Sequence, residues 1–158
     1  MVFMIYFHLL MKTWQNMVDR YIVLSSFAKQ KFLDLNFPST NFSIKPNFLE
    51  NPPKPSNKIG NFGLFIGRIG EEKGFDCLID ALKNHPNLCM KIIGDGPARN
   101  GLIQKIERNR LKNVEFLGLM DYHNCMEHLR QARFFIFPSI WYEGMPMVVL
   151  EAMAAGKP

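Results

Sequence analysis

The fold of this chain is indicated most directly by the stretch "FGLFIGRIGEEKGFDCLIDAL", residues 62–82. Its first six residues form a compact apolar run that ends at glycine, which is typical of a strand buried on both faces. After a short polar turn, four apolar residues follow the spacing of one helix face: Phe75, Leu78, Ile79 and Leu82. The stretch therefore predicts a strand at 62–67, a turn, and a helix at 74–84.

The same alternation of strand and helix continues along the chain. Further compact apolar runs predict strands at residues 21–25, 89–94, 114–118 and 134–138. Helical patterns between and after these runs predict helices at residues 26–36, 98–110, 121–131 and 146–155. This order predicts an α/β fold with a Rossmann-like, doubly wound parallel sheet and flanking helices.

Residues 45–61 interrupt the alternation. The segment contains four prolines and four asparagines, and each proline removes a backbone donor and restricts the residue before it. We therefore expect an interdomain linker at 45–61, followed by an incomplete α/β domain at 62–158. Residues 1–44 are expected to hold one strand with its flanking helices, as a remnant of the end of a preceding domain. Both ends of the chain look cut.

Composition and charge exclude several classes of protein. With 47% hydrophobic and 21% charged residues the chain is globular rather than disordered. The net charge of +5 does not indicate nucleic-acid binding, because the Lys and Arg residues are scattered; attraction to anionic ligands or to a membrane surface is the preferred interpretation. Three unequally spaced cysteines without a CxxC pair indicate neither a disulfide framework nor a zinc ribbon, so the cytoplasm is the simplest compartment.

The first residues, "MVFMIYFHLLMK", are apolar. They are too few to span a bilayer and lack the basic region and cleavage site of a signal peptide. We expect a buried or amphipathic helix there.

Ligands of open parallel sheets bind beyond the carboxyl ends of the strands, where each strand turns into a helix. The first such turn, "GRIGEEKG", places Arg68 and Lys73 beside a helix start, where the helix dipole favours an anion over a cation. A bound anion would resolve this conflict. The alternative is that both basic side chains are solvated and balanced by Glu71 and Glu72.

The second turn is "GDGP", residues 94–97. It supplies Gly94 and Gly96, and Pro97 is suited to the first position of a helix. Arg99 stands where the dinucleotide fingerprint GxGxxG requires glycine, so a nicotinamide-dependent oxidoreductase is disfavoured.

The third turn, within "FLGLMDYH", exposes Leu119 and Met120 after a strand. They are either part of the core or an apolar face on which a flat base rests. No metal site is expected, because four neighbouring side chains match no common ligand spacing: Asp121, His123, Cys125 and His128.

The fourth turn lies in "WYEGMPMVVLEAMAAGKP", residues 141–158, where the chain enters a helix near Pro146. We expect backbone N–H groups in this region to point into the cleft, and Gly144 to allow close approach of a phosphate. The residues concerned are Gly144, Met145, Met147 and Val148.

Two carboxylates, Glu143 and Glu151, flank this helix start, and Glu151 lies on the side of the helix that the loop faces. Because an unpaired buried carboxylate costs several kcal/mol, Glu151 needs a partner. Two acceptors around an anion-binding helix start suit a nucleotide sugar, with hydroxyls on both sides of its diphosphate. The alternative is that Glu151 belongs to a structural hydrogen-bond network and Glu143 is a solvated loop charge.

In this order, "GRIGEEKG", "IIGDGP", "VEFLG" and "PSIWYEGMPMVVLEAMAAGKP" resemble the carboxyl-terminal domain of the retaining glycosyltransferases of family four, the glycosyl transferases group 1. The similarity runs from about Val18 to Pro158. It implies a partial GT-B fold. Most of the amino-terminal domain, which carries the acceptor site, would precede Met1 or come from a partner chain.

The resemblance also implies roles. Arg68 and Lys73 hold the donor diphosphate, Glu143 contacts the transferred hexose, and these three residues are the catalytic candidates. Glu151 binds the ribose hydroxyls, and the turn with Leu119 and Met120 contacts the base. The other donor-binding candidates are loop glycines and helix-start residues: Gly67, Gly94, Gly96, Gly144, Met145, Met147 and Val148.

The implied reaction is transfer of a hexose from a UDP- or GDP-sugar to the hydroxyl of a carbohydrate or lipid-linked acceptor, with retention of anomeric configuration, in polysaccharide or glycolipid synthesis. No metal or other cofactor is implied, because the Arg and Lys neutralise the leaving diphosphate. We expect the isolated chain to be inactive without the amino-terminal domain, with peripheral membrane contact plausible. The alternative is a catalytically inactive nucleotide-sugar-binding module or assembly partner.

Overall fold

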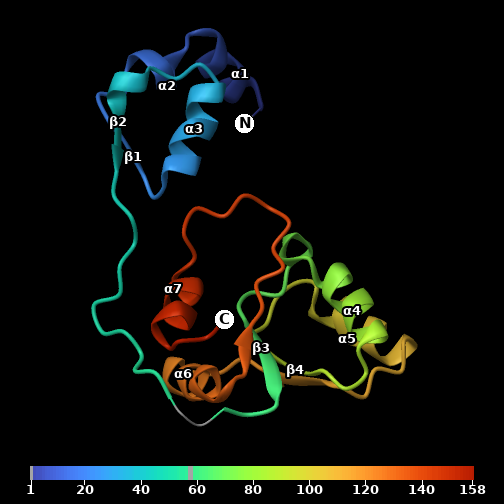
Figure 1. Ribbon diagram of the computed structural model, residues 1–158. Helices are drawn as coiled ribbons and strands as arrows, with labels where there is room; N and C mark the ends of the chain where they lie inside the picture. Colours follow the sequence, from blue (N-terminus) through green and yellow to red (C-terminus); the bar gives the residue numbers. More distant parts are fainter. Residues whose placement is uncertain (1, 57–58) are drawn as a thin grey trace. The chain divides into compact units, whose positions relative to one another are not determined.

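The computed structural model describes residues 2–56 and 59–158. Residue contacts divide the chain into two compact units, Met1–Phe48 and Leu49–Pro158, here called unit 1 and unit 2. The division falls within the segment 45–61 (Figure 1). That unit 1 is the end of an amino-terminal domain stays a prediction.

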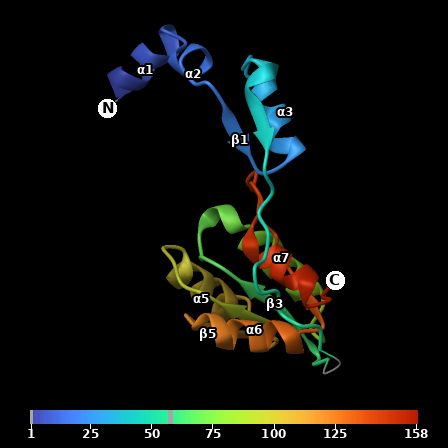
Figure 2. The same ribbon diagram turned by 90° about the vertical axis from the view of Figure 1, so that its left-hand side faces the viewer.

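Unit 1 contains a small parallel sheet of two strands, β1 (Tyr21–Val23) and β2 (Phe42–Ile44). Its helices are α1 (Val2–Leu10), α2 (Thr13–Asn16) and α3 (Ser26–Asp34), with a 3-10 turn at Ser39–Asn41. Helix α3 packs beside the two strands (Figure 2). The expectation of a single strand in this region is wrong, because the three residues of β2 are too few to show strand periodicity.

Strand β1 is also shorter than the predicted 21–25. Ser25 ends the extended segment because it is the N-cap of α3, and its hydroxyl accepts a hydrogen bond from the backbone N–H of Ala28 at 3.1 Å. Aromatic rings fill the space between α3 and the strands, with Tyr21 stacked on Phe42 at a centroid distance of 5.2 Å.

The apolar start of the chain is helical, as predicted, but it is neither buried nor amphipathic. Large side chains on all sides of α1 are exposed, among them Phe3, Met4 and Ile5. The helix is apolar around its whole circumference, so it has no polar face that would fix one orientation on a core. Across the described part of the chain, each helix is too short or too polar to reach from one side of a membrane to the other.

Unit 2 is a four-stranded, wholly parallel sheet of β3 (Phe62–Ile66), β4 (Cys89–Ile93), β5 (Val114–Gly118) and β6 (Phe134–Phe135). The strand order is β5-β4-β3-β6, so the chain first adds strands on one side of β3 and then crosses to the other. This reversal confirms the predicted doubly wound α/β fold.

Four helices cover the two faces of this sheet: α4 (Phe75–Asn84), α5 (Arg99–Arg108), α6 (Tyr122–Gln131) and α7 (Met147–Ala154). Side chains of β3 alternate between two cores, with Phe65 in a cluster with α4 and α5, and Leu64 in a cluster with α6 and α7. The two helix pairs flank the sheet on opposite sides in Figure 1.

Two predicted boundaries in unit 2 are wrong for local reasons. Strand β6 ends at Phe135 rather than at residue 138, because the chain leaves the sheet toward Pro138, which has no N–H to donate. Pro97 is not the first residue of α5. The helix begins at Arg99, one residue after the predicted 98, and Pro97 lies in the preceding turn, in which the N–H of Arg99 donates to the Gly96 carbonyl at 3.1 Å.

Candidate functional site

The carboxyl ends of β3, β4 and β5 are joined by backbone hydrogen bonds. The N–H of Gly67 donates to the carbonyl of Ile93 at 3.0 Å, and the N–H of Gly94 donates to the carbonyl of Gly118 at 2.8 Å. Gly94 has φ +144°, and a Cβ there would overlap the carbonyl oxygen of Gly67. Only glycine therefore permits this close approach of two strand ends.

A cavity of about 280 Å³ opens over these strand ends. Five predicted site residues line it: Gly67, Arg68, Gly94, Leu119 and Met120. Leu119 is exposed, whereas Met120 packs partly against the core. Gly96, also predicted, instead lies against the backbone of Ile69.

Arg68 is held by a carboxylate of its own turn. Its guanidinium lies 2.5 Å from Oε1 of Glu72, and its side chain is exposed while that of Glu72 is largely buried. The pKa of Glu72 is lowered by the hydrogen bond from its own backbone N–H and by Arg68. Arg68 therefore lies at the surface of the cavity with an internal counter-ion.

Lys73 joins the first turn to the fourth. Its Nζ lies 2.6 Å from Oε1 of Glu143, and the hydroxyl of Ser139 donates to the same oxygen at 2.7 Å. These two hydrogen bonds lower the pKa of the Glu143 carboxyl. Both contacts use Oε1, so Oε2 is the oxygen that can meet a ligand.

The two loops are also fixed by their backbones. The N–H of Ile140 donates to the carbonyl of Glu72 at 3.0 Å. Gly74 has φ +67°, and a Cβ there would overlap the carbonyl oxygen of Pro138. The loop before α7 thus rests directly on the turn that carries Arg68 and Lys73.

Glu151 lies in α7, and 9% of its surface is exposed. This carboxylate is therefore buried, and its neighbours in the helix are apolar. Burial raises the pKa of its carboxyl, and the Tyr122 hydroxyl donates a hydrogen bond to it. The pKa of Tyr122 is itself raised by burial and then by the charge of Glu151. Cys125, which lines the cavity, has a pKa raised by burial, by Asp121 and by Glu151. Glu151 does not line the cavity itself; its neighbour in α7, Ala152, packs in the same core cluster as Cys125.

The remaining predicted donor-binding residues lie on both sides of the point where α7 begins. Pro146 is the N-cap, and its carbonyl accepts from the N–H of Val149 at 3.1 Å. Gly144 and Met145 lie in the loop, whereas Met147 and Val148 form the first turn, where N–H groups lack an acceptor within the helix.

Sequence reasoning missed two hydroxyl groups, those of Ser139 and Tyr122. Ser139 is four positions before Glu143, which is a weak signal for contact in a loop. Tyr122 and Glu151 are far apart in sequence and meet only because α6 and α7 share one face of the sheet.

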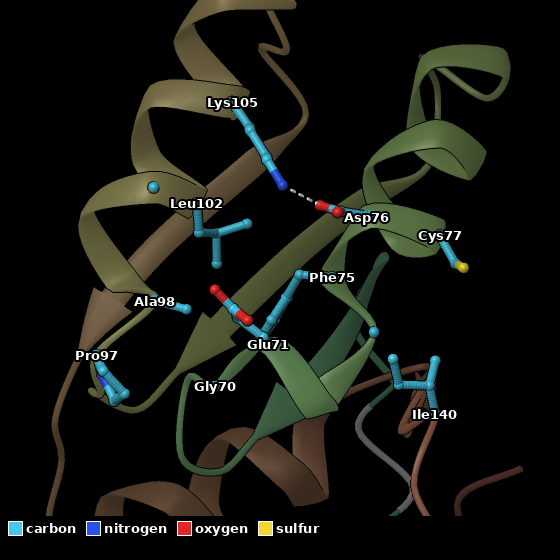
Figure 3. A pocket seen from close by; sticks show the side chains of 12 residues that line it. Gly70, Glu71, Phe75, Asp76, Cys77, Pro97, Ala98, Leu102, Lys105 and Ile140 are labelled. Carbon is cyan, nitrogen blue, oxygen red and sulfur yellow. Dashed lines mark hydrogen bonds and ion pairs between the residues drawn. The ribbon is translucent and has the colours of Figure 1, made fainter.

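A second cavity, of about 510 Å³, lies between α4 and α5, behind the same turn (Figure 3). The Asp76 carboxylate and the Lys105 ammonium form an ion pair across it, and Ile140 stands at its edge. Arg68, Lys73, Glu143 and Glu151 lie outside its lining.

Among residues 2–56 and 59–158, no group of three or more His, Cys, Asp or Glu side chains is arranged to hold a metal ion. Metal independence itself stays a prediction.

The parallel sheet and its rim place unit 2 among the carboxyl-terminal domains of GT-B glycosyltransferases. Staphylococcus aureus TarM, in a complex with fondaparinux, α-GlcNAc-glycerol and UDP, matches with a TM-score of 0.76 and 24% identity, over 91% of this chain and 30% of that chain. Anabaena HepE, in complex with UDP-glucose, matches with a TM-score of 0.75 and 24% identity, over 93% of this chain and 46% of that chain. These similarities show the fold.

Residues 48–158 match the family glycosyl transferases group 1, and the chain belongs to this family. An uncharacterized glycosyltransferase of Methanocaldococcus jannaschii is 38% identical over 98 residues, which is 62% of this chain and 27% of that protein. Glycogen synthase of Mycobacterium tuberculosis is 35% identical over 100 residues, which is 60% of this chain and 24% of that protein. The chain thus spans about a quarter of the length of these relatives.

Proposed function

We propose that the carboxyl rim of unit 2 binds the donor nucleotide sugar of a retaining hexosyltransferase. The observation that carries this proposal is the contact between Lys73 and Glu143, which brings a cation and a carboxylate from distant turns to one place. Arg68, Leu119 and Met120 line the adjoining cavity. Family membership supports glycosyl transfer, while the UDP- or GDP-hexose donor and the retention of configuration are parts of the proposal.

The diphosphate would lie against Arg68 and Lys73. Both cations are paired in the structure, with Glu72 and Glu143, so the donor has to compete for them. In the reaction, the bond between the anomeric carbon and the diphosphate breaks, the acceptor oxygen bonds to that carbon, and the acceptor proton passes to the departing phosphate. Two cations aimed at this growing negative charge lower the barrier without a metal ion.

The two carboxylates would bind hydroxyl groups on either side of the diphosphate. Oε2 of Glu143 accepts from a hydroxyl of the hexose, and Glu151 accepts from the ribose. Leu119 and Met120 would support the base, and the backbone of Gly67, Gly94, Gly96, Gly144, Met145, Met147 and Val148 would line the path of the donor.

The acceptor of the whole protein is proposed to be a hydroxyl group on a carbohydrate or a lipid-linked glycan, on the basis of family membership. A cytoplasmic location and peripheral contact with a membrane are proposed as well. Catalysis is not expected from this chain without the amino-terminal domain, or a partner chain in its place, which would supply most of the acceptor site.

Isothermal titration of the chain with UDP-glucose and GDP-mannose tests the proposal. We expect saturable binding of at least one donor, weakened by ~1.5 to 3 kcal/mol in Arg68→Ala, the usual range for a charge-assisted hydrogen bond. Arg108→Ala, at the far end of α5, is the matched control and should bind as the wild type does. A folded sample that binds neither donor contradicts the proposal.

Donor hydrolysis distinguishes an enzyme from a binding module. The chain and a longer protein that includes the amino-terminal domain are compared for release of UDP or GDP. Release by the longer protein alone supports the transferase. Binding without release in both favours a nucleotide-sugar-binding module.

A further inference from the structure

The loop between β6 and α7 exposes two aromatic side chains directly before Glu143. Trp141 is 69% exposed and Tyr142 is 78% exposed. Together with Ile140 they line a hollow of about 470 Å³. Contiguous exposed apolar surface that lies beside a polar site is a candidate for ligand binding.

This loop is fixed on both sides of the aromatic residues. Before them, the N–H of Ile140 is hydrogen-bonded to the Glu72 carbonyl at 3.0 Å. After them, the Glu143 carboxylate is held by Lys73 at 2.6 Å and by Ser139 at 2.7 Å. Because both ends of the loop are anchored, Trp141 and Tyr142 are held at a defined place. A ligand that binds them therefore loses little free energy to ordering of the backbone.

The chemistry of the hollow suits a neutral sugar ring. A pyranose has an apolar face of C–H groups and a polar rim, and an aromatic side chain offers a matching flat surface with few rotatable bonds. The side chains of residues 140–142 carry no charge, so they do not fit the diphosphate of the donor. The cations that do fit it, Arg68 and Lys73, lie in the turn at the end of β3.

Exposure also separates this hollow from the donor site. Glu151 is buried and Met120 is partly buried, whereas Trp141 and Tyr142 are exposed and reachable by a large glycan. The aromatic residues are adjacent in sequence to the carboxylate proposed to contact the transferred hexose. A ring bound on them would therefore have its hydroxyl groups near the reacting carbon.

We propose that Trp141, together with Tyr142, forms a stacking subsite for a pyranose ring of the acceptor. The assignment of that ring to the acceptor rests on the proposed function. The stacking itself does not, since it depends only on the aromatic loop.

Tryptophan fluorescence tests the subsite. The chain has two tryptophans, so a Trp14→Phe variant reports on Trp141 alone. It is titrated with methyl α-D-glucopyranoside, methyl α-D-mannopyranoside and methyl β-D-galactopyranoside, with glycerol as a polyol that has no ring face. We expect a saturable change in emission with at least one pyranoside and none with glycerol.

Variants then locate the binding by calorimetry. Trp141→Ala is expected to weaken pyranoside binding about tenfold, while Trp141→Phe retains most of it. Met153→Ala removes a side chain that is 67% exposed on α7 and serves as the matched control, with unchanged binding expected. Donor binding should be the same in all three variants.

The outcomes are distinguishable. No response to any pyranoside in a sample that still binds UDP- or GDP-hexose overturns the subsite alone. Pyranoside binding without donor binding supports the subsite and contradicts the proposed donor site. A response of Trp141 to phosphatidylglycerol vesicles but not to pyranosides overturns the subsite in favour of membrane contact.

Discussion

A donor diphosphate would compete with Glu72 for the guanidinium of Arg68. Removing the charge of Glu72 therefore tests how much the ion pair between Arg68 and Glu72 opposes donor binding. In Glu72→Gln the guanidinium loses its counter-ion, while the Glu72 carbonyl that anchors Ile140 remains. We expect donor affinity to rise, because the diphosphate no longer competes with an internal counter-ion for Arg68. Titration calorimetry measures it, and Glu71→Gln, its neighbour, is the matched control with no expected gain. Weaker binding by Glu72→Gln would mean that Glu72 orients Arg68 for the donor.

Glu151 and Glu143 have pKa values shifted in opposite directions, so they predict opposite dependences of stability on pH. Burial raises the pKa of Glu151 above its usual 4.5, so its contribution is present below 4.5 and is lost as pH rises through the raised value. The hydrogen bonds from Lys73 and Ser139 lower the pKa of Glu143, so its contribution is present above 4.5 and is lost as pH falls through the lowered value.

Glu151→Gln should therefore be more stable than the wild type at neutral pH, with the difference shrinking as pH falls through the raised pKa of Glu151 and gone below 4.5. The amide oxygen can still accept the hydrogen bond of Tyr122. Glu143→Gln is the matched comparison and should be less stable than the wild type at neutral pH, with that difference also disappearing in acid. Urea denaturation across the pH range measures both. Equal behaviour of the two variants would contradict the assigned environments.

The contact between the first turn and the loop before α7 depends on one glycine at the start of α4. Gly74→Ala introduces a Cβ at φ +67° that overlaps the Pro138 carbonyl oxygen, and we expect a loss of ~1 to 3 kcal/mol in the free energy of unfolding. The loop must move away, so the contact between Lys73 and Glu143 and the binding of donor should weaken as well.

Gly101→Ala is the control for this change. Gly101 lies inside α5, and an added Cβ there meets nothing within 4 Å. We expect a gain of about 1 kcal/mol from helix propensity, without an effect on donor binding. Chemical denaturation and calorimetry measure both variants. A destabilised Gly101→Ala would show that the cavity between α4 and α5 closes on that position.

The elements of unit 2 could be predicted from sequence because their signals are local. The ends of strand β3 and helix α4 lie within one residue of the predicted 62–67 and 74–84. The apolar run of a buried strand and the apolar spacing of a helix face can both be recognised within a short stretch of sequence. Strand β2 could not be predicted, because a three-residue strand has no period.

The side-chain contacts of the candidate site could not be predicted from local sequence, because they join residues that are far apart in the chain. Lys73 and Glu143 are 70 positions apart, and their meeting depends on the crossing of the chain from β5 to β6. The sequence indicated that Glu151 needs a partner, but only the packing of α6 and α7 on one face identifies Tyr122 as that partner.

The two units of the molecule differ in how much core each contains. Unit 2 has a buried cluster on each face of its sheet. Within the described residues of unit 1, Val23 is the one buried hydrophobic side chain. The other apolar contacts in this unit are mainly between aromatic rings that are partly exposed. A unit with so little buried surface contributes little cooperative stability of its own.

Removal of residues 1–48 should therefore leave unit 2 folded, and every residue proposed to bind the donor lies in the part that remains. We expect a chain that starts at Leu49 to have the same thermal midpoint in calorimetry and the same affinity for donor as the 158-residue chain. Amide hydrogen exchange on the longer chain should show strong protection in β3 and β4 and weak protection in β1 and β2, because exchange follows the stability of each cooperative unit. If the shortened chain unfolds or loses the donor while the longer one binds it, unit 1 stabilises the site, and the two units form one cooperative structure.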